Sequence, residues 1–215
     1  MKKTLSVLLL LVFLNIALVG INIIQKGGVY KGQSMTEILG VPAEKAVPED
    51  IEKLTKSQIM QLFYAAPAPD FESMKGEYKA RTLPVGIQAP AADYFTHHFF
   101  GPGHWEGKAF APVGNDKGRG YNLFSVPVKD GQVSVVRTRR LDSFEGKSPI
   151  DGKKSYILNY SAYNSGVVHG MQDEVRKVND KLFICMGYMD IGGGSINPAP
   201  FILYGEPEKW MGPDK

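Results

Sequence analysis

The sequence predicts an all-β domain in which an antiparallel meander of eight to ten strands closes as a barrel, preceded by a short amphipathic helix and an apolar N-terminal segment. The chain has 24 Gly and 14 Pro residues, and they separate short segments rich in Tyr, Phe and Val. From Gly76 onward these segments alternate apolar and polar residues without intervening helical patterns. A meander of this size protects its exposed edges most simply by closing.

The composition is that of an ordinary globular protein, because the 215 residues are 43% hydrophobic and 22% charged. Disorder and repeat arrays are therefore poor interpretations. The net charge is +3, and Lys2 and Lys3 supply much of it, so we expect no basic surface for nucleic acid. The single cysteine, Cys185, excludes an intramolecular disulfide and a multi-cysteine metal site.

Residues 1–24 predict a transmembrane signal-anchor. An uncharged run extends from Thr4 to Ile24, and about 20 apolar residues suffice to span a bilayer core. A cleaved signal peptide has the same basic start and apolar centre, although residues 16–20 offer only a poor cleavage site. The Lys pair before the run is expected to stay on the cytoplasmic side. We therefore expect a globular domain outside the cytoplasm, held by one N-terminal helix, or secreted if the segment is cleaved.

Residues 25–48 are expected to form a linker, and residues 49–215 the barrel domain with its N-terminal helix. The linker is polar and rich in glycine, which favours flexibility, with one helical turn expected at Thr36 to Leu39. In residues 49–66, apolar side chains recur at helical spacing after a possible Ser57 cap, and Pro67 ends the pattern. The apolar stripe consists of Ile59, Leu62, Phe63 and Ala66.

The rest of the domain contains segments with the alternation typical of strands. Turn signals such as Lys129-Asp130-Gly131 separate them. The segment Lys181–Met189 is apolar on both sides, so the helix of residues 59–66 should cover its outer face. The expected strands are Gly76–Thr82, Tyr94–Phe100, Trp105–Phe110, Gly120–Val128, Gln132–Leu141, Ser155–Tyr163, Val167–Val178, Lys181–Met189 and Pro200–Tyr204.

Two segments carry an ordered set of motifs. Residues 63–86 contain the end of a helix, a proline-containing loop, a strand and a Pro-x-Gly turn, and residues 166–178 contain an Asp-x-x-Arg-x-Val run. Both resemble the small lipocalin-like, calycin-type barrels that carry a Gly-x-Trp-x-Gly signature. Gly76 matches the first glycine, whereas Tyr78 replaces the Trp and Ala80 the second Gly. The resemblance extends from Lys56 to Tyr204 and implies a barrel that holds an apolar ligand, without implying catalytic residues.

Arg137 and Arg139 are candidate ligand-binding residues. Alternation places both on the more apolar face of their strand, so this face should point inward. A buried arginine needs an anionic partner. The carboxylate or phosphate head of a lipid-like ligand would supply one through bidentate hydrogen bonds. Alternatively, the two arginines lie at the rim or pair with Asp173 or Glu174.

A second interpretation makes the most polar strand a catalytic one. His169, Asp173 and Glu174 are candidate acid/base groups, and Arg176 is a candidate electrostatic stabiliser. Charged residues on a half-solvated strand also form structural salt bridges at a rim, and this alternative stays open.

No cofactor is expected, although a zinc ion and a haem group remain two alternatives. His98, His104 and Glu106 flank a tight Gly-Pro-Gly turn and offer a set of two histidines and one carboxylate for zinc, whereas aromatic and imidazole packing explains the same residues. His169 is a candidate haem ligand by analogy with barrels that hold haem, and otherwise a structural histidine.

Three functions therefore remain open. The expected one is a membrane-tethered barrel that binds a small apolar, lipid-like molecule with an anionic head, in contact with Tyr188 among others. The alternatives are an enzyme that acts on a small apolar substrate in the same cavity and a structural envelope protein whose barrel is packed solid. A cavity with few charges would favour binding, and converging polar groups would favour catalysis.

Overall fold

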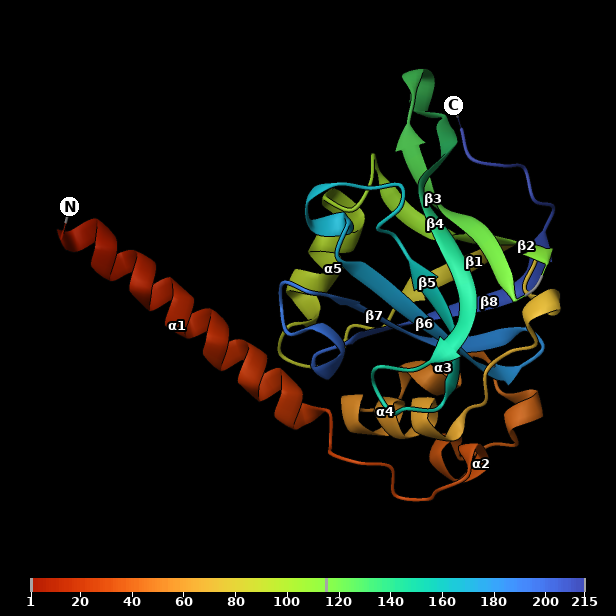
Figure 1. Cartoon of the computed structure of the whole chain (residues 1–215), viewed down its shortest axis with the longest axis horizontal. Coiled ribbons are helices and arrows are strands. Elements are labelled where there is room, and N and C mark those ends of the chain that lie inside the picture. The colour runs from red at the N-terminus through yellow and green to blue at the C-terminus, as the bar shows by residue number, and fades with distance from the viewer. Residues whose placement is uncertain (1, 115, 215) are drawn as a thin grey trace.

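Eight antiparallel strands close into a barrel in the computed structural model. The structure describes residues 2–114 and 116–214. In the first helix, it describes the side chains of residue 10 and of residues from 12 onward. Each strand pairs with the next along the chain (Figure 1). The strands are β1 Gly76–Thr82, β2 His104–Gly114, β3 Lys117–Pro127, β4 Val133–Lys147, β5 Lys154–Asn159, β6 Met171–Asn179, β7 Leu182–Met189 and β8 Ala199–Glu208.

Strands β1 and β8 complete the barrel. Thr82 lies opposite Phe201, and Ala80 lies opposite Leu203. The first strand thus pairs with the last, and both edges of the eight-stranded sheet are covered, as the edge argument requires. The predicted antiparallel meander barrel is confirmed, at the lower end of the expected number of strands.

Helices contribute more of the chain than the sequence predicts, so the all-β class needs correction to a mixed α/β one. Helix α2 confirms the helical turn expected at residues 36–39 of the linker, and its Ile38 and Leu39 are buried against α4. In Figure 1, α2, α3 and α4 gather beside one part of the barrel, and α5 lies near α1. The α-helices described are α1 Lys2–Gln25, α2 Met35–Leu39, α3 Pro48–Glu52, α4 Lys56–Ala65 and α5 Ala89–His98.

Helix α4 covers the outer face of β7. It begins with a capping box in which the backbone N–H of Thr55 donates to Gln58 Oε1 at 2.9 Å, so Thr55 is the N-cap in place of the expected Ser57. Its buried Ile59 packs in one cluster with Ile184 of β7. The apolar character of both faces of β7 is thereby explained.

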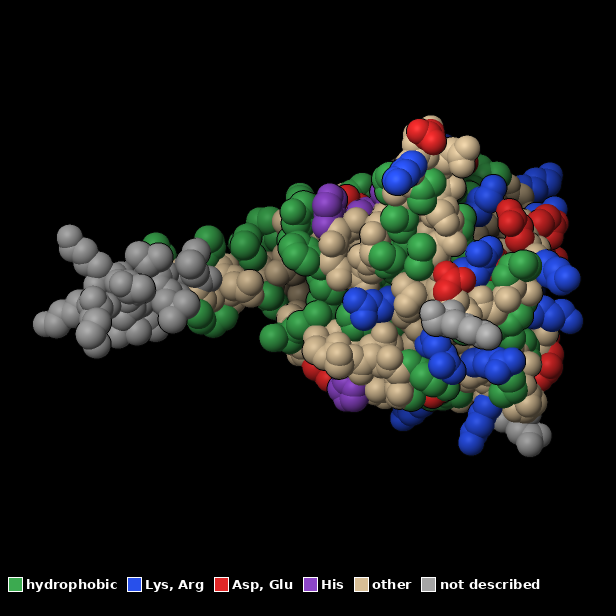
Figure 2. Space-filling view, turned by 90° about the horizontal axis from the view of Figure 1, so that it is seen from above, with side chains coloured by type: hydrophobic (Ala, Val, Ile, Leu, Met, Phe, Trp, Pro, Cys, Tyr) green, Lys and Arg blue, Asp and Glu red, His purple; other side chains and the backbone are tan. Residues whose placement is uncertain are grey.

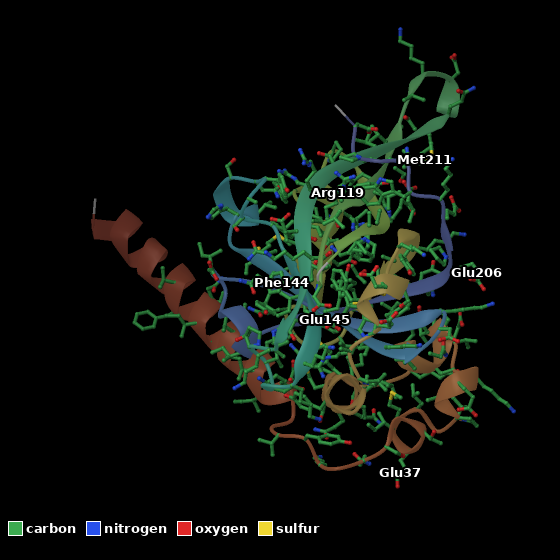
Figure 3. The ribbon with its side chains drawn as sticks, turned by 45° about the vertical axis from the view of Figure 1, so that its right-hand side comes forward. Glu37, Arg119, Phe144, Glu145, Glu206 and Met211 are labelled. Atoms are coloured by element: carbon green, nitrogen blue, oxygen red, sulfur yellow. The ribbon has the colours of Figure 1, made fainter. Side chains whose placement is uncertain are left out.

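Aromatic side chains fill much of the barrel interior. Phe110 has ring centroids of Tyr78 and Tyr156 at 5.7 and 5.6 Å, and Tyr78 also meets Phe183 edge-on. Tyr78 is itself buried in the interior. Figure 3 shows side chains crowding the space that the strands enclose. Such edge-to-face pairs add about 0.5–1.5 kcal/mol each beyond the burial of their area.

Two predicted strands need correction. Residues 94–100 lie mostly in α5, which has a proline in its first turn and alanines that favour a helix. The rings of Tyr94 and His98 stack at 4.2 Å, one helical turn apart. The alternation was therefore only apparent. Strand β6 begins at Met171, because Gly166–Val168 forms a short 3-10 helix, and His169 therefore lies outside the strand.

Helix α1 projects away from the barrel at its N-terminal end (Figure 1). Apolar atoms lie along the part of α1 that Figure 2 colours, and Phe13 and Ile16 are exposed. The first part of the predicted anchor, the side chains of residues 1–9 and 11, lies outside the described residues. Within the described part of the chain, no helix combines the length and hydrophobicity needed to cross a membrane.

Candidate functional site

A cavity of about 300 Å³ opens at one end of the barrel. In a meander, odd strands end where even strands begin, so this end gathers the end of β1 and β7 with the start of β2, β6 and β8. Helices α1 and α5 contribute the rest of the wall. The volume falls at the lower end of the range for small-molecule sites, roughly 300–1,000 Å³. Its apolar lining includes Phe95, Phe100, Trp105, Met171 and Phe201.

Lys108 of β2 and Asp173 of β6 form an ion pair that lines the cavity from inside the barrel. Lys108 Nζ lies 2.8 Å from Asp173 Oδ2, and the two side chains are 2% and 3% exposed. Removing two charges from water costs several kcal/mol per ion, and close pairing with further hydrogen bonds must offset that cost. The pair is electrically neutral as a unit.

Asn122 and Tyr160 complete the hydrogen bonding of this pair. Lys108 Nζ donates to Asn122 Oδ1 at 2.8 Å and to the Tyr160 hydroxyl at 2.5 Å. That hydroxyl donates to Asp173 Oδ2 at 2.8 Å. With Asp173, these acceptors use all three N–H donors of the ammonium group. We call Lys108, Asp173, Asn122 and Tyr160 the polar cluster.

Aromatic rings surround the ammonium group of the polar cluster. Lys108 Nζ lies 5.2 Å from the ring centroids of Trp105, Tyr160 and Phe201, a range in which cations are attracted to the ring face. Burial, and secondarily the Asp173 carboxylate, raises the pKa of the Tyr160 hydroxyl and of the Cys185 thiol well above their usual range. Cys185 therefore stays a thiol, which does not act as a nucleophile.

Gly187 of β7 leaves space beside the carboxylate of Asp173. The two residues are paired across β6 and β7, and a Cβ at Gly187 would lie 2.8 Å from Asp173 Oδ1. The bonds from Lys108 and Tyr160 both go to Oδ2. Among the described residues Oδ1 has no hydrogen-bond partner, so it is available to a bound molecule.

Three amide side chains fasten the end of α1 over the cavity mouth. Asn22 Nδ2 donates to Gln88 Oε1 at 3.1 Å and to Asn197 Oδ1 at 2.7 Å. Asn197 Nδ2 donates to Gln88 Oε1 at 2.9 Å. In addition, the backbone N–H of Ile87 donates to Gln25 Oε1 at 2.8 Å. We call Asn22, Gln88 and Asn197 the amide clasp.

The candidate residues of β6 separate between its two faces. Asp173 lines the cavity, as does Tyr188 on β7. Glu174 and Arg176 point to the other face, where Arg176 Nη2 lies 2.9 Å from Asp151 Oδ1 and Tyr188 donates to Glu174 Oε1 at 3.1 Å. Both are buried there. Of the acid/base candidates, the structure therefore brings only Asp173 to the cavity.

His169 is exposed in the turn before β6. Its Nδ1 lies 3.0 Å from the backbone oxygen of Ser161, a contact that explains the histidine structurally. The cavity lining does not include it. The position favours neither an acid/base role nor haem ligation.

Arg137 and Arg139 also lie away from the cavity lining. Arg137 forms a bidentate pair with Glu77, with Nε and Nη2 at 2.8 and 3.2 Å from the two carboxylate oxygens. Arg139 has a φ of 55°, and its Nε donates to the backbone oxygen of Phe100 at 2.5 Å. A register shift between Gly120 and Asn122 accompanies this irregularity, and simple alternation along β4 fails there. The geometry does not favour a head-group clamp built from these arginines.

The zinc candidates do not converge. His98 stacks on Tyr94 within α5, whereas the ring of His97 stacks on His104 at 3.9 Å. His104 Nδ1 lies 3.2 Å from Glu106 Oε1. Across the described residues, no group of three or more His, Cys, Asp or Glu side chains is placed to hold a metal ion. The packing interpretation accounts for the aromatic contacts.

Sequence reasoning missed Lys108, Asn122 and Tyr160. One signal was present, because Lys108 shares its strand face with Phe110, and a lysine on an apolar face needs an interior partner. The register shift between Trp105 and Gly107 hid the fact that Trp105 joins the same side. Asn122 and Tyr160 carry no comparable pattern.

No protein-family model matches this chain, and no curated protein matches it. A solved structure described as a protein from Thermomonospora curvata is similar, with 15% identity over 71% of this chain and 88% of that chain and a TM-score of 0.48. The class defined by the fold is an eight-stranded closed antiparallel β-barrel. No family is assigned to it.

Proposed function

We propose that the barrel is a binding protein for a small, largely apolar molecule of the size of a short lipid. The cavity carries this proposal: about 300 Å³ of space lined by Phe95, Phe100, Trp105, Met171 and Phe201. A barrel that served only as a scaffold would gain stability by filling this volume, because an unfilled apolar space forfeits packing contacts. The proposal agrees with the ligand-holding, lipocalin-like barrels that the sequence resembles.

The polar cluster agrees with binding because Lys108 and Asp173 compensate each other's charge, so the cluster gives the apolar cavity one oriented polar wall without a net charge. Its hydrogen bonds hold Lys108 and Asp173 in fixed positions, and Asp173 Oδ1 is available to a donor on the ligand. A few placed polar groups in a mainly apolar lining are typical of small-molecule sites.

Displacement of a neutral fluorescent probe, N-phenylnaphthylamine, from the full-length chain tests the proposal. Wild type should bind the probe and release it on addition of decanol. Ala92→Trp places a large side chain on the α5 wall of the cavity and should abolish probe binding. Ala162→Trp, at an exposed position away from the lining, is the matched control and should bind normally. Equal binding by both variants would refute the cavity as the site.

An enzyme that uses the same cavity is the second candidate function. The specific observation in its favour is the contact of Asp173 with both Lys108 and Tyr160, since a carboxylate beside a cation and a hydroxyl is an acid/base arrangement. Turnover of a bound molecule, seen as a new mass in native mass spectrometry after incubation, would favour the enzyme. Recovery of the same mass would favour the binding protein.

We also propose that α1 keeps the barrel at a membrane, as the sequence predicts. The support is the uncharged run from Thr4 to Ile24 and the exposed Phe13 and Ile16. Replacing both exposed residues with Glu should move the full-length chain from the membrane pellet to the supernatant after an alkaline wash. Retention in the pellet would count against this attachment.

A further inference from the structure

Lys56 is a buried cation on the wall of the cavity. It is the first residue of α4, only 5% of its surface is exposed, and it lines the cavity mouth. A Cβ placed at Gly86 would lie 2.9 Å from Lys56 Cδ and 2.6 Å from Asn22 Oδ1. The aliphatic stem of Lys56 therefore lies where α4, the end of α1 and the loop after β1 meet.

The ammonium group of Lys56 has no partner among the residues that the structure describes. No carboxylate lies within ion-pair distance of it there, in contrast to Lys108 deeper in the same cavity. The nearby charge that acts on it is another cation, Lys26. A buried lysine is almost always paired, because an unpaired buried charge is costly. Lys56 therefore presents at the cavity mouth a positive charge that has no ion-pair partner in the described chain.

We propose that Lys56 binds the anionic head of the ligand, a carboxylate-type amphiphile whose apolar tail fills the aromatic part of the cavity. This inference rests on the proposed binding function and names the chemical class of the ligand. The tail would lie against Phe95 and Phe201, which line the same cavity. In this proposal Lys56, at the cavity mouth, binds the head group in place of Arg137 and Arg139.

The other charges at the cavity fit this assignment. Lys108 and Asp173 neutralise each other. Asp93 of α5 also lines the cavity, but its Oδ1 accepts a hydrogen bond from Thr82 at 2.7 Å and lies 3.5 Å from His97 Nε2. A carboxylate head would be attracted by Lys56 and Lys26 and kept apart from Asp93 by repulsion.

The neutral groups at the mouth can also take part. Asn22 Oδ1 is buried and has no donor within the described chain, so a protonated or hydroxylated head could donate to it. An ionised head cannot do so, since it only accepts. A pair of ligands with the same tail and either a charged or a neutral head distinguishes the two cases.

The test compares decanoate with decanol, which share the tail and differ in the charge of the head. Each displaces N-phenylnaphthylamine from the full-length chain at pH 7. Wild type should bind decanoate at least ten times more tightly than decanol, since a hydrogen bond to a charged group contributes about 1.5–3 kcal/mol. Lys56→Gln should remove this preference by weakening decanoate alone, and Lys56→Arg should keep most of it. Lys53→Gln, an exposed lysine on the neighbouring helix end, is the matched control and should match wild type.

A pH series adds a second readout. Burial, and to a smaller extent Lys26, lowers the pKa of Lys56 to about 8. The ammonium form prevails below that pH, so the preference for decanoate should be full at pH 7 and should fall as the pH rises past about 8. The groups that face Lys56 from the packed elements are Lys26, Asn22 and Gln25, and Asp93 lies on the same cavity wall.

The outcomes separate the two proposals. Equal affinity of wild type for decanoate and decanol would overturn the head-group site while the binding function stands. Failure of both ligands to displace the probe would count against the binding function itself. A decanoate preference that survives Lys56→Gln would also overturn the role of Lys56.

Discussion

Lys108 and Asp173 form their ion pair across the interior of the barrel, from β2 and β6, which are not neighbours in the sheet. Asn122 of β3 and Tyr160, just after β5, bond to the same ammonium group. Four separate parts of the barrel thus meet at one nitrogen atom. The position of each depends on the others, and this dependence can be measured.

Loss of one member of the pair should be costly. Lys108→Met leaves the Asp173 carboxylate buried without its cation, and removal of one partner from a buried pair typically costs about 3–5 kcal/mol. Urea unfolding of the variant should show this loss, and the double variant Lys108→Met with Asp173→Leu should recover much of it. The same change at exposed Lys154, which pairs with Glu145 at the surface, should leave the free energy of unfolding near that of wild type. A double variant no more stable than Lys108→Met would contradict the pairing.

Glu174 should make stability depend on pH in a particular direction. Burial raises the pKa of its carboxyl above the ordinary 4.5, against hydrogen bonds from serines and Tyr188. The folded state therefore binds this proton more tightly than the unfolded state does. Ionisation of the carboxyl destabilises the folded state at pH values above the folded pKa, and this penalty disappears as the pH falls toward 4.5. Compared with wild type, Glu174→Gln should gain free energy of unfolding as the pH rises from 4 to 8, by about 1.4 kcal/mol per unit of pKa shift.

Glu37 provides a control of opposite sign. Hydrogen bonds from the backbone and side chain of Ser34 lower its pKa. The ionised carboxylate therefore stabilises the folded wild type, and this stabilisation is lost as the pH falls through the lowered pKa. Glu37 lies near the edge of the molecule in Figure 3. Relative to wild type, Glu37→Gln should therefore have its most favourable free energy of unfolding at acid pH. Parallel pH profiles for the two variants would show that neither carboxyl is responsible.

The C-terminal segment should contribute to stability through one ring. Trp210 lies 4.5 Å from the ring of Tyr121, whose hydroxyl accepts hydrogen bonds from the backbone N–H groups of Met211 and Gly212 at 3.2 and 3.1 Å. Trp210→Ala should cost about 1–2 kcal/mol, less than a fully buried Trp. Met211→Ala, at a side chain that is 64% exposed, should cost almost nothing. Figure 3 shows Met211 and Arg119 toward the same end of the molecule. Equal thermal unfolding of both variants would argue against this contact.

The amide clasp should control the local order of α1. Asn22→Ala removes two hydrogen bonds but leaves Gln88 and Asn197 bonded to each other. Hydrogen exchange should become faster over Val19 to Gln25 with little change in global unfolding, because local openings require less free energy than global ones. Leu14→Ala, at an exposed side chain of the same helix that the cavity lining does not include, is the control and should exchange as wild type does.

The sequence predicted the strands better than the site. Alternation correctly identified Gly76–Thr82 and located the other barrel strands, because a half-buried strand must alternate. It failed at Tyr94 to Phe100, where aromatic residues one helical turn apart imitate a strand. It also failed at Arg139, where an irregular backbone breaks the period. The polar cluster could not be predicted, since closure brings together residues from strands that are distant along the chain.

Closure of β1 on β8 has a consequence for how the chain folds. Thr82 and Phe201 are separated by almost the whole barrel sequence, and contacts between distant residues slow folding because the intervening chain must first be ordered. Until β8 is synthesised, the N–H and C=O groups along one side of β1 have no strand to bond. A nascent chain would therefore expose an unpaired strand edge during synthesis, and a chaperone bound at that stage would protect the chain from aggregation.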